Sequence, residues 1–374
     1  MKADVMPKPQ NMFQAYMLLF LISSGQIGVG IFGFQRIVGM HSDHDAWISV
    51  IVAGIVSHIV VGLMFWILSK HESADLYGIH QHLFGRWIGN GLSMVMMVYY
   101  VMVSVTIVRT YIELIQSWIF PTFPTWVLSM TLLLLAWYGT TGGIRLIAGL
   151  STISFFVILF FMGTLYISPI KYASWSHLLP IGEASPWAIM KGTISMGLTI
   201  SGFESIFYIY PYIKDKSNGA KYAQYSLLFS NIIYLFMMIM GIVYFSKGQL
   251  TRSIWASTSM LKIVKFPFLE RLEYIASSVW MFVVIPGLMI YIWVLGRGFK
   301  RMMGWKQRIM TPIICFVIFI GSLISQDREH IHMLSTFTGR CALFVVFLYP
   351  VVLFLFQTLI LGIRDQSDKK GAAE

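Results

Sequence analysis

The sequence predicts an all-α integral membrane protein with ten transmembrane helices in two inverted five-helix repeats. Of the 374 residues, 57% are hydrophobic and only 11% are charged, whereas a soluble domain carries about 25% charged residues. The apolar residues form runs long enough to cross a bilayer, which takes about 20 residues. Two of these runs, the first and the sixth, are interrupted by glycines, as is typical of transporters built from inverted repeats.

Ten apolar runs are candidate membrane spans. They cover residues 11–34, 46–69, 88–119, 124–140, 145–168, 187–210, 222–246, 272–295, 309–325 and 339–362. We expect a single polytopic domain over 1–374, with a first five-helix repeat over 11–168 and a second over 187–362. Two long loops with amphipathic pieces, 70–87 and 247–271, fall at equivalent places in the two halves, which supports the repeat.

The distribution of basic residues predicts that both termini are cytoplasmic. With the N-terminus inside, sixteen Lys and Arg residues fall in inside segments and eight in outside loops, as the positive-inside rule requires. The first apolar run lacks a convincing small-residue cleavage site, so we expect a retained span rather than a signal peptide. The net charge of +11 is assigned to these loops, which meet anionic lipid, and not to nucleic-acid binding.

The first span contains four glycines within nine residues, Gly25-Gln26-Ile27-Gly28-Val29-Gly30-Ile31-Phe32-Gly33. Each glycine costs about 1 kcal/mol in a helix relative to alanine. One interpretation is a small-residue face for close helix packing. The other is a broken helix, in which free N–H groups at Gly28, Val29 and Gly30 would bind a carboxylate at the start of the next half-helix.

The sixth span has a matching interruption, with small and polar residues crowded between Gly197 and Gly202. Free carbonyls at Leu198, Thr199 and Ser201 would lie at the negative end of a half-helix and could accept hydrogen bonds from an ammonium group. A carboxylate site opposite an ammonium site suits the backbone of an amino acid. The pair of breaks therefore favours a ligand site over a packing face alone.

Three further side chains are candidates for this site. Glu204 places a carboxylate near mid-membrane, where an ionisable group is costly and faces a cavity or a partner. It could bind a proton, balance a cationic group, or accept hydrogen bonds from the free N–H groups of the first break. In the third span, Tyr99 or Tyr100 could place a phenol over the cavity. Adjacent helical residues point about 100° apart, so at most one of the two does so.

Other chemistry is not indicated by the sequence. Cys315 and Cys341 lie inside apolar runs without disulfide or zinc spacing. Histidines and acidic residues cluster at 41–45 and 327–332, and solvated loops explain them better than a metal site, because the helical ligand spacing is absent. The sequence has no nucleophile elbow, phosphate loop or dinucleotide fingerprint. We expect neither an enzyme nor a protein with a cofactor or metal.

Two motifs resemble those of a known family. Ile27-Gly28-Val29-Gly30-Ile31-Phe32 resembles the unwound first span of the amino acid–polyamine–organocation (APC) transporters, and Gly202-Phe203-Glu204 resembles a motif of their sixth span. More narrowly, Gln26 to Gly30, the ten spans and the short chain resemble the spore germination permease family, the B subunits of bacterial spore germinant receptors.

The resemblance implies a LeuT/APC-like fold with broken helices 1 and 6. It also implies that a germinant, often an amino acid, binds in an APC-type central pocket. The N–H groups of Gly28, Val29 and Gly30 would then bind its carboxylate, and we call these three groups the cradle. The protein would work with a larger A-type subunit and a lipoprotein C-type subunit in the spore inner membrane, and binding would be the signal.

Two departures from the family patterns bear on function. Phe34-Gln35-Arg36 follows the glycines where the spore family often has Leu-Pro, and the fifth span lacks the lysine that some proton-coupled APC members use. The second departure favours a sensor. The alternative is a secondary active amino acid transporter, coupled to protons or sodium. The sequence does not identify the ligand, because it does not fix which residues of spans 3, 8 and 10 turn inward.

Overall fold

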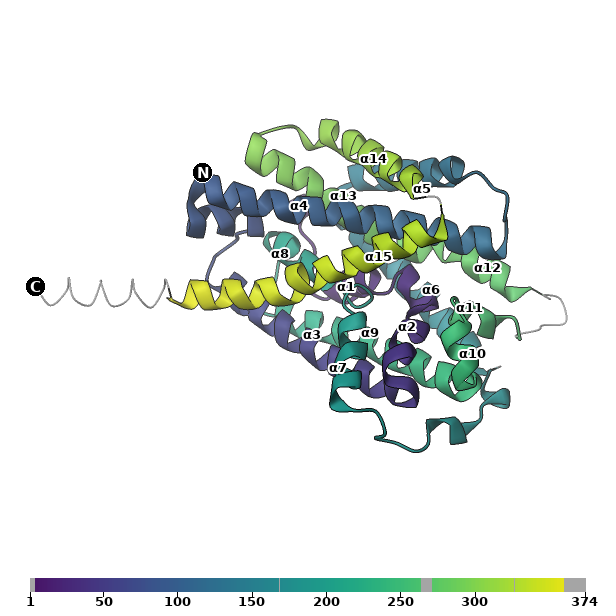
Figure 1. Cartoon of the computed structure of the whole chain (residues 1–374). Coiled ribbons are helices and arrows are strands. Elements are labelled where there is room, and N and C mark those ends of the chain that lie inside the picture. Colours follow the sequence, from purple (N-terminus) through teal and green to yellow (C-terminus); the bar gives the residue numbers. More distant parts are fainter. Residues whose placement is uncertain (1–3, 168, 264–270, 326, 360–374) are drawn as a thin grey trace, which may run out of the picture.

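The computed structural model describes residues 4–167, 169–263, 271–325 and 327–359 (Figure 1). Within these ranges the regular elements are α-, 3₁₀- and π-helices. The β-type pairing there is limited to two isolated β-bridges. The prediction of an all-α protein is therefore confirmed.

The predicted first span is two helices separated by a break. α1 (Met17–Gln26) ends in the glycine stretch, a 3₁₀-helix η2 (Val29–Phe32) follows, and α2 (Phe34–Ser42) continues the chain. Between α1 and η2, Ile27 has φ −89° and ψ 91°, and Gly28 has φ −118° and ψ −145°. Because neither pair of angles is helical, the interpretation of this stretch as a broken helix is confirmed.

The other spans of the first half are continuous helices, except that α4 has a kink at Gly85. They are α3 (Ala46–Ser69), α4 (Leu76–Trp118), α5 (Thr125–Thr141) and α6 (Gly143–Ile167). Gly85 has φ +75°, so the part of α4 before it is the amphipathic piece predicted ahead of the third span. Short 3₁₀-helices lie in the connections, namely η1 (Pro9–Asn11), η3 (Asp43–Asp45), η4 (Pro169–Tyr172) and η5 (Trp175–Leu178).

The sixth span is broken like the first. α7 (Pro186–Ser195) is separated by residues 196–202 from η6 (Phe203–Ser205), α8 (Ile206–Ile209) and η7 (Tyr210–Tyr212). The remaining helices include two short ones, α10 and α11, in the predicted amphipathic loop. They are α9 (Gly219–Tyr244), α10 (Lys247–Arg252), α11 (Ala256–Leu261), α12 (Leu272–Val279), α13 (Met281–Met303), α14 (Gln307–Ile324), α15 (Arg328–Ala342) and the π-helix η8 (Leu343–Leu348).

Seven helical stretches in the described ranges are long and apolar enough to cross a membrane. They correspond to predicted spans 2, 3, 5, 7, 8, 9 and 10. The other three predicted spans are the two broken ones and α5, which has 17 residues. The ten predicted ranges thus coincide with helices, and the number of crossings stays a prediction.

α1 lies at the centre of the bundle, where it packs against α6, α9 and α13 (Figure 1). Its Leu18, Leu21 and Ile22 are fully buried. The N-terminal segment before α1 is fixed to neighbouring connections: Val5 N–H donates to the Ser73 carbonyl at 2.8 Å, and Phe13 N–H donates to the Tyr212 carbonyl at 3.0 Å. This segment therefore covers the end of the bundle at which α1 begins.

The two broken spans touch each other through their backbones. A Cβ atom added to Gly202 would lie 2.4 Å from the carbonyl carbon of Gly25, and one added to Gly25 would lie 3.3 Å from the Gly202 oxygen. Gly202 also has φ +120°, a conformation that L side chains rarely adopt. Position 202 therefore requires glycine for both its conformation and its contact.

We expect Gly202→Ala to destabilise the protein by roughly 2–4 kcal/mol, because it combines backbone strain with a steric clash against another backbone. Thermal unfolding of the detergent-solubilised protein, followed by tryptophan fluorescence, measures the change. Gly62→Ala is the control, since a Cβ atom there meets nothing within 4 Å. Equal melting temperatures for Gly202→Ala and wild type would contradict the close contact of the two breaks.

Candidate functional site

A cavity of about 220 Å³ lies between the two breaks. Its lining includes residues of α2, of the α10–α11 connection and of the start of α15. Its walls come from both breaks and from α4, α13 and α15. The lining residues include Gln26, Gly28, Val29, Gly30, Val103, Thr106, Thr110, Leu198, Thr199, Ser201, Trp255, Tyr291 and Ser335.

The first break contains free N–H groups, and its residues Gly28, Val29 and Gly30 line this cavity. The last hydrogen bond of α1 runs from Ile27 N–H to the Ser23 carbonyl at 2.8 Å. A 3₁₀-helix leaves its first N–H groups without intrahelical acceptors. Within the described ranges, the N–H groups of Gly28, Val29 and Gly30 have no hydrogen-bond acceptor. They are the three predicted from the sequence.

The four glycines divide between the two interpretations of the stretch. A Cβ atom at Gly33 would lie 2.7 Å from the Ile254 oxygen, so Gly33, like Gly25, serves close packing. A Cβ atom at Gly28 would meet nothing within 4 Å, and one at Gly30 would meet only Thr199, at 3.5 Å. The two outer glycines of the stretch therefore serve close packing, and the two inner ones leave the backbone accessible.

The second break brings Leu198, Thr199 and Ser201 to the opposite wall of the cavity. The Leu198 carbonyl accepts from Ser201 Oγ at 2.7 Å, and the Thr199 carbonyl accepts from the Tyr234 hydroxyl at 3.0 Å. The Ile200 carbonyl accepts from Gln26 Nε2 at 2.8 Å. The three residues predicted from the sequence thus lie together, but two of their carbonyls already have donors from the protein.

Glu204 does not line the cavity itself but is hydrogen-bonded to Tyr291, which does. The residue is 2% exposed. Its Oε2 accepts a hydrogen bond from Gly202 N–H at 2.6 Å, and its Oε1 accepts one from the Tyr291 hydroxyl at 3.1 Å. The sequence allowed hydrogen bonds from the N–H groups of the first break; the structure places the carboxylate on the N–H of the second break instead. Tyr291 lines the cavity and connects it to Glu204.

Tyr99 and Tyr100 are both buried and stand next to Tyr291 rather than in the first layer around the cavity. The Tyr100 ring stacks on Tyr291 with 5.4 Å between centroids, and the Tyr99 ring lies 5.4 Å from Tyr100. The described residues of α4 that line the cavity begin one turn later, at Val103. Direct contact of either phenol with a ligand stays a prediction.

Several residues that contact the two breaks could not be assigned from the sequence. The Trp280 indole N–H donates to the Gly28 carbonyl at 3.2 Å, and the single hydrogen of the Tyr234 hydroxyl is shared between the Gln26 carbonyl at 2.8 Å and the Thr199 carbonyl at 3.0 Å. Trp255, between α10 and α11, covers the first break. The sequence signal for Trp255 was the predicted surface helix in 247–271; Tyr234 and Trp280 had no comparable signal.

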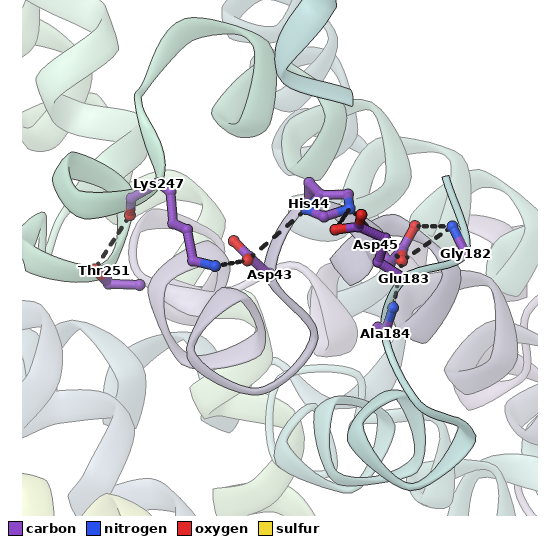
Figure 2. A network of polar contacts seen from close by, with 8 residues as sticks. All are labelled: Asp43, His44, Asp45, Gly182, Glu183, Ala184, Lys247 and Thr251. Carbon is purple, nitrogen blue, oxygen red and sulfur yellow. Dashed lines mark hydrogen bonds and ion pairs between the residues drawn. The ribbon is translucent and has the colours of Figure 1, made fainter. Parts of the chain in front are cut away.

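Acidic residues next to α2 form a polar network, which Figure 2 shows. Asp45 is fully buried, and its carboxylate accepts from Gly182 N–H and Ala184 N–H, each at 2.9 Å. His44 lies within 3.8–3.9 Å of three carboxylates, those of Asp43, Asp45 and Glu183, and Lys247 pairs with Asp43 (Figure 2). The prediction of a solvated loop is wrong for Asp45, because its carboxylate caps the backbone of the loop before α7.

A sequence model of the family described as "Spore germination protein" matches residues 13–331. The chain is 37% identical over 349 residues to spore germination protein GerQB of Bacillus cereus, covering 93% of this chain and 96% of that relative. It is 23% identical over 361 residues to spore germination protein A2 of Bacillus subtilis (strain 168), covering 94% and 96%.

Solved transporters have a similar fold. A manganese transporter of Eremococcus coleocola, bound to an aromatic bis-isothiourea compound, matches with a TM-score of 0.63 at 12% identity, over 91% of this chain and 78% of the transporter. An outward-open Na⁺-coupled sialic acid symporter matches with a TM-score of 0.63 at 9% identity, over 89% and 79%. At such identities the likeness concerns the fold alone, and it confirms the predicted LeuT/APC-like architecture.

We expect Asp45→Ala to destabilise the protein by roughly 2–4 kcal/mol, since it leaves two backbone N–H groups without their charged acceptor. Thermal unfolding of the purified protein measures the loss. Glu183→Ala is the matched control, because Glu183 belongs to the same network but its side chain is 63% exposed, so the change should stay within about 0.5 kcal/mol. Equal losses for the two variants would contradict a structural role of Asp45.

Proposed function

The chain belongs to the spore germination protein family, and we propose that it is the germinant-binding membrane subunit of a spore germinant receptor. In this proposal it senses a small molecule, an amino acid, in the cavity between the broken helices. The observation that carries the proposal is that Gly28, Val29 and Gly30 line this cavity and that their N–H groups have no acceptor within the described part of the chain. Free N–H groups at the start of a half-helix are suited to a carboxylate.

The proposed site places the two ends of the amino acid backbone on the two breaks. The carboxylate lies on the cradle of the first break, and the amino group faces the second break at Leu198, Thr199 and Ser201. Glu204, Tyr99 and Tyr100 support the site from behind Tyr291. Binding then shifts a conformational equilibrium by the difference in affinity between two states of the protein.

The proposed setting is a receptor complex in the spore inner membrane, with both termini of this chain in the cytoplasm. An A-type subunit and a lipoprotein C-type subunit would receive the signal. The long apolar helices and the family membership support a multi-pass subunit that works with other receptor subunits. No nucleic acid is involved in this proposal.

Secondary active transport of an amino acid is the alternative, and the similar fold of a manganese transporter and of a Na⁺-coupled symporter makes it worth testing. In such transporters the carbonyls of the broken helices coordinate the coupling ion. Here the carbonyls of Gly28, Thr199 and Ile200 accept hydrogen bonds from Trp280, Tyr234 and Gln26. Each of these carbonyls has a donor from the protein and keeps a second lone pair, so flux measurements separate the two functions.

Reconstitution in liposomes separates the two functions. We expect the purified protein to bind an amino acid from a panel of the twenty common ones, with the same affinity in sodium and in potassium, and to accumulate none inside the vesicles. Binding is measured by thermal shift and calorimetry, and flux with the radiolabelled binder under imposed proton and sodium gradients. Saturable uptake driven by either gradient would overturn the sensor proposal in favour of transport.

Gly30→Leu tests the cradle itself. A leucine side chain at this position would extend past Thr199, whose Cγ2 lies 3.5 Å from the added Cβ, into the space from which a carboxylate reaches the N–H groups. We expect binding of the amino acid to fall at least a hundredfold. Gly62→Leu is the control, because an added Cβ meets nothing within 4 Å there; full binding by a folded Gly30→Leu protein would place the ligand elsewhere.

A further inference from the structure

Arg340 is an exposed arginine within Arg328–Leu359, a helical stretch that is long and apolar enough to cross a membrane. It lies close to the C-terminal end of α15. In the described part of the chain it has no ion pair, hydrogen bond or aromatic ring contact. A charged side chain inside a bilayer is costly and is almost always paired, so the partner of Arg340 must be sought outside these residues.

The structure places Arg340 deeper than its position at the start of the predicted span 339–362 suggests. α14 has 18 residues and ends shortly before α15 begins, so it extends about 27 Å from this connection. Arg340 lies twelve positions after Arg328, the first residue of α15, hence about 18 Å along the helix. The adjacent Gly339 packs on the second break, because a Cβ atom added to it would lie 3.6 Å from Leu198 Cβ. Arg340 is therefore level with the breaks, far from the helix ends at which a long side chain extends to water.

Other arginines on the described helices have partners within the chain. Arg109 in α4 donates to the Ser325 carbonyl through Nε and to Gln116 Oε1 at 3.3 Å through a terminal nitrogen. The guanidinium of Arg297 in α13 lies 5.4 Å from the centroid of the Tyr212 ring. Arginines that turn towards the protein are thus paired inside it, and the exposed arginine of α15 differs from them.

Large apolar side chains flank Arg340 on the exposed face of α15, which crosses the near side of the bundle in Figure 1. Met333, Phe337 and Phe344 are 53%, 58% and 63% exposed. With Arg340 they are spaced by four, three and four positions, which places them along one side of a helix. The same spacing is typical of the seam between two packed helices. The other side of α15 turns inward, where Ile331 lines the cavity.

We infer that this face of α15 is the docking surface for a transmembrane helix of a different protein, which carries an aspartate or glutamate at the depth of Arg340. A carboxylate supplies both the opposite charge and the acceptors that match a guanidinium. Apolar residues on the same helix would pack on Met333, Phe337 and Phe344. This interface goes beyond the proposed function, because it concerns assembly and does not depend on what the cavity binds.

Two other partners fit the position of Arg340 less well. Lipid phosphates lie outside the hydrocarbon core, which is about 30 Å thick, whereas Arg340 is level with the breaks. A second copy of this chain would need an exposed carboxylate at the same depth. In the described ranges the carboxylate beside the breaks is that of Glu204, which is 2% exposed. A different membrane protein is therefore the better source of the carboxylate.

Photo-crosslinking of the full-length protein in the membranes of the cells that produce it tests the docking surface. Phe344 is replaced by the photoreactive amino acid p-benzoylphenylalanine, and mass spectrometry identifies the crosslinked peptide. We expect a transmembrane segment of another protein that contains an aspartate or glutamate. The same replacement of Phe316 in α14 is the matched control, because Phe316 is also 63% exposed but lies on another helix; it should not give this product.

Arg340→Leu tests the charge at the centre of the surface. We expect the crosslinking yield at Phe344 to fall roughly fivefold to thirtyfold, as for the loss of a polar contact between membrane helices. The purified variant should melt no lower than wild type, because it loses an unpaired charge, and this measurement separates the effect from misfolding. Arg145→Leu is the control: Arg145 is also exposed but is the third residue of α6, near a helix end, and its loss should leave the yield unchanged. If Arg340→Leu does not fold, Arg340→Glu combined with an arginine at the crosslinked carboxylate should restore the yield that Arg340→Glu alone loses.

Crosslinks to lipid alone, to a second copy of the chain or to a segment without a carboxylate would overturn the docking surface. An unchanged yield in Arg340→Leu would do the same, as would an equal loss in Arg145→Leu or a charge exchange that restores nothing. None of these results affects the binding of an amino acid by the purified protein, which the liposome experiment measures. Conversely, a chain that binds no amino acid can still dock a partner through Arg340.

Discussion

The direct backbone contact between Gly25 and Gly202 is the constraint on which the rest of the site depends. Two helices that cross at this distance cannot both keep side chains at the crossing point, and Gly202 must also adopt a positive φ. Beyond the contact, each helix loses its regular hydrogen bonds for several residues. The contact thus fixes where the N–H groups of the first break and the carbonyls of the second break lie.

A break of this kind exposes polar backbone inside a membrane protein, where each unsatisfied group is costly. The protein satisfies the acceptors from several directions: Tyr234 from α9, Trp280 next to α13, and Gln26 from α1 itself. The donors at Gly28, Val29 and Gly30 have no such partners within the described ranges. The backbone carbonyls at the breaks therefore have hydrogen-bond donors from the protein, whereas the N–H groups remain available to a ligand.

Much of the layout could be predicted from the sequence, because it follows from local composition. The ten apolar ranges coincide with helices, and the glycines of the first span, together with the matching interruption of the sixth, predicted the break that lies between Gln26 and Val29. The partners of the breaks could not be predicted in the same way. Tyr234 and Trp280 reach them from over thirty to some two hundred and fifty residues away along the chain, and which face of a helix turns inward depends on packing that one sequence does not specify.

Glu204 illustrates the same limit and links two parts of the site. The sequence identified a costly carboxylate near the second break, yet the structure aims it at Gly202 N–H and the Tyr291 hydroxyl. The two hydrogen bonds end on the same carboxyl group, so Glu204 links the bend at Gly202 to the wall of the cavity at Tyr291. A ligand that contacts Tyr291 is then linked through two hydrogen bonds to the glycine on which the crossing of the two spans depends. If the proposed function holds, occupancy of the cavity biases the geometry of both broken helices through these contacts, and a receptor subunit would use such a connection between its pocket and its fold.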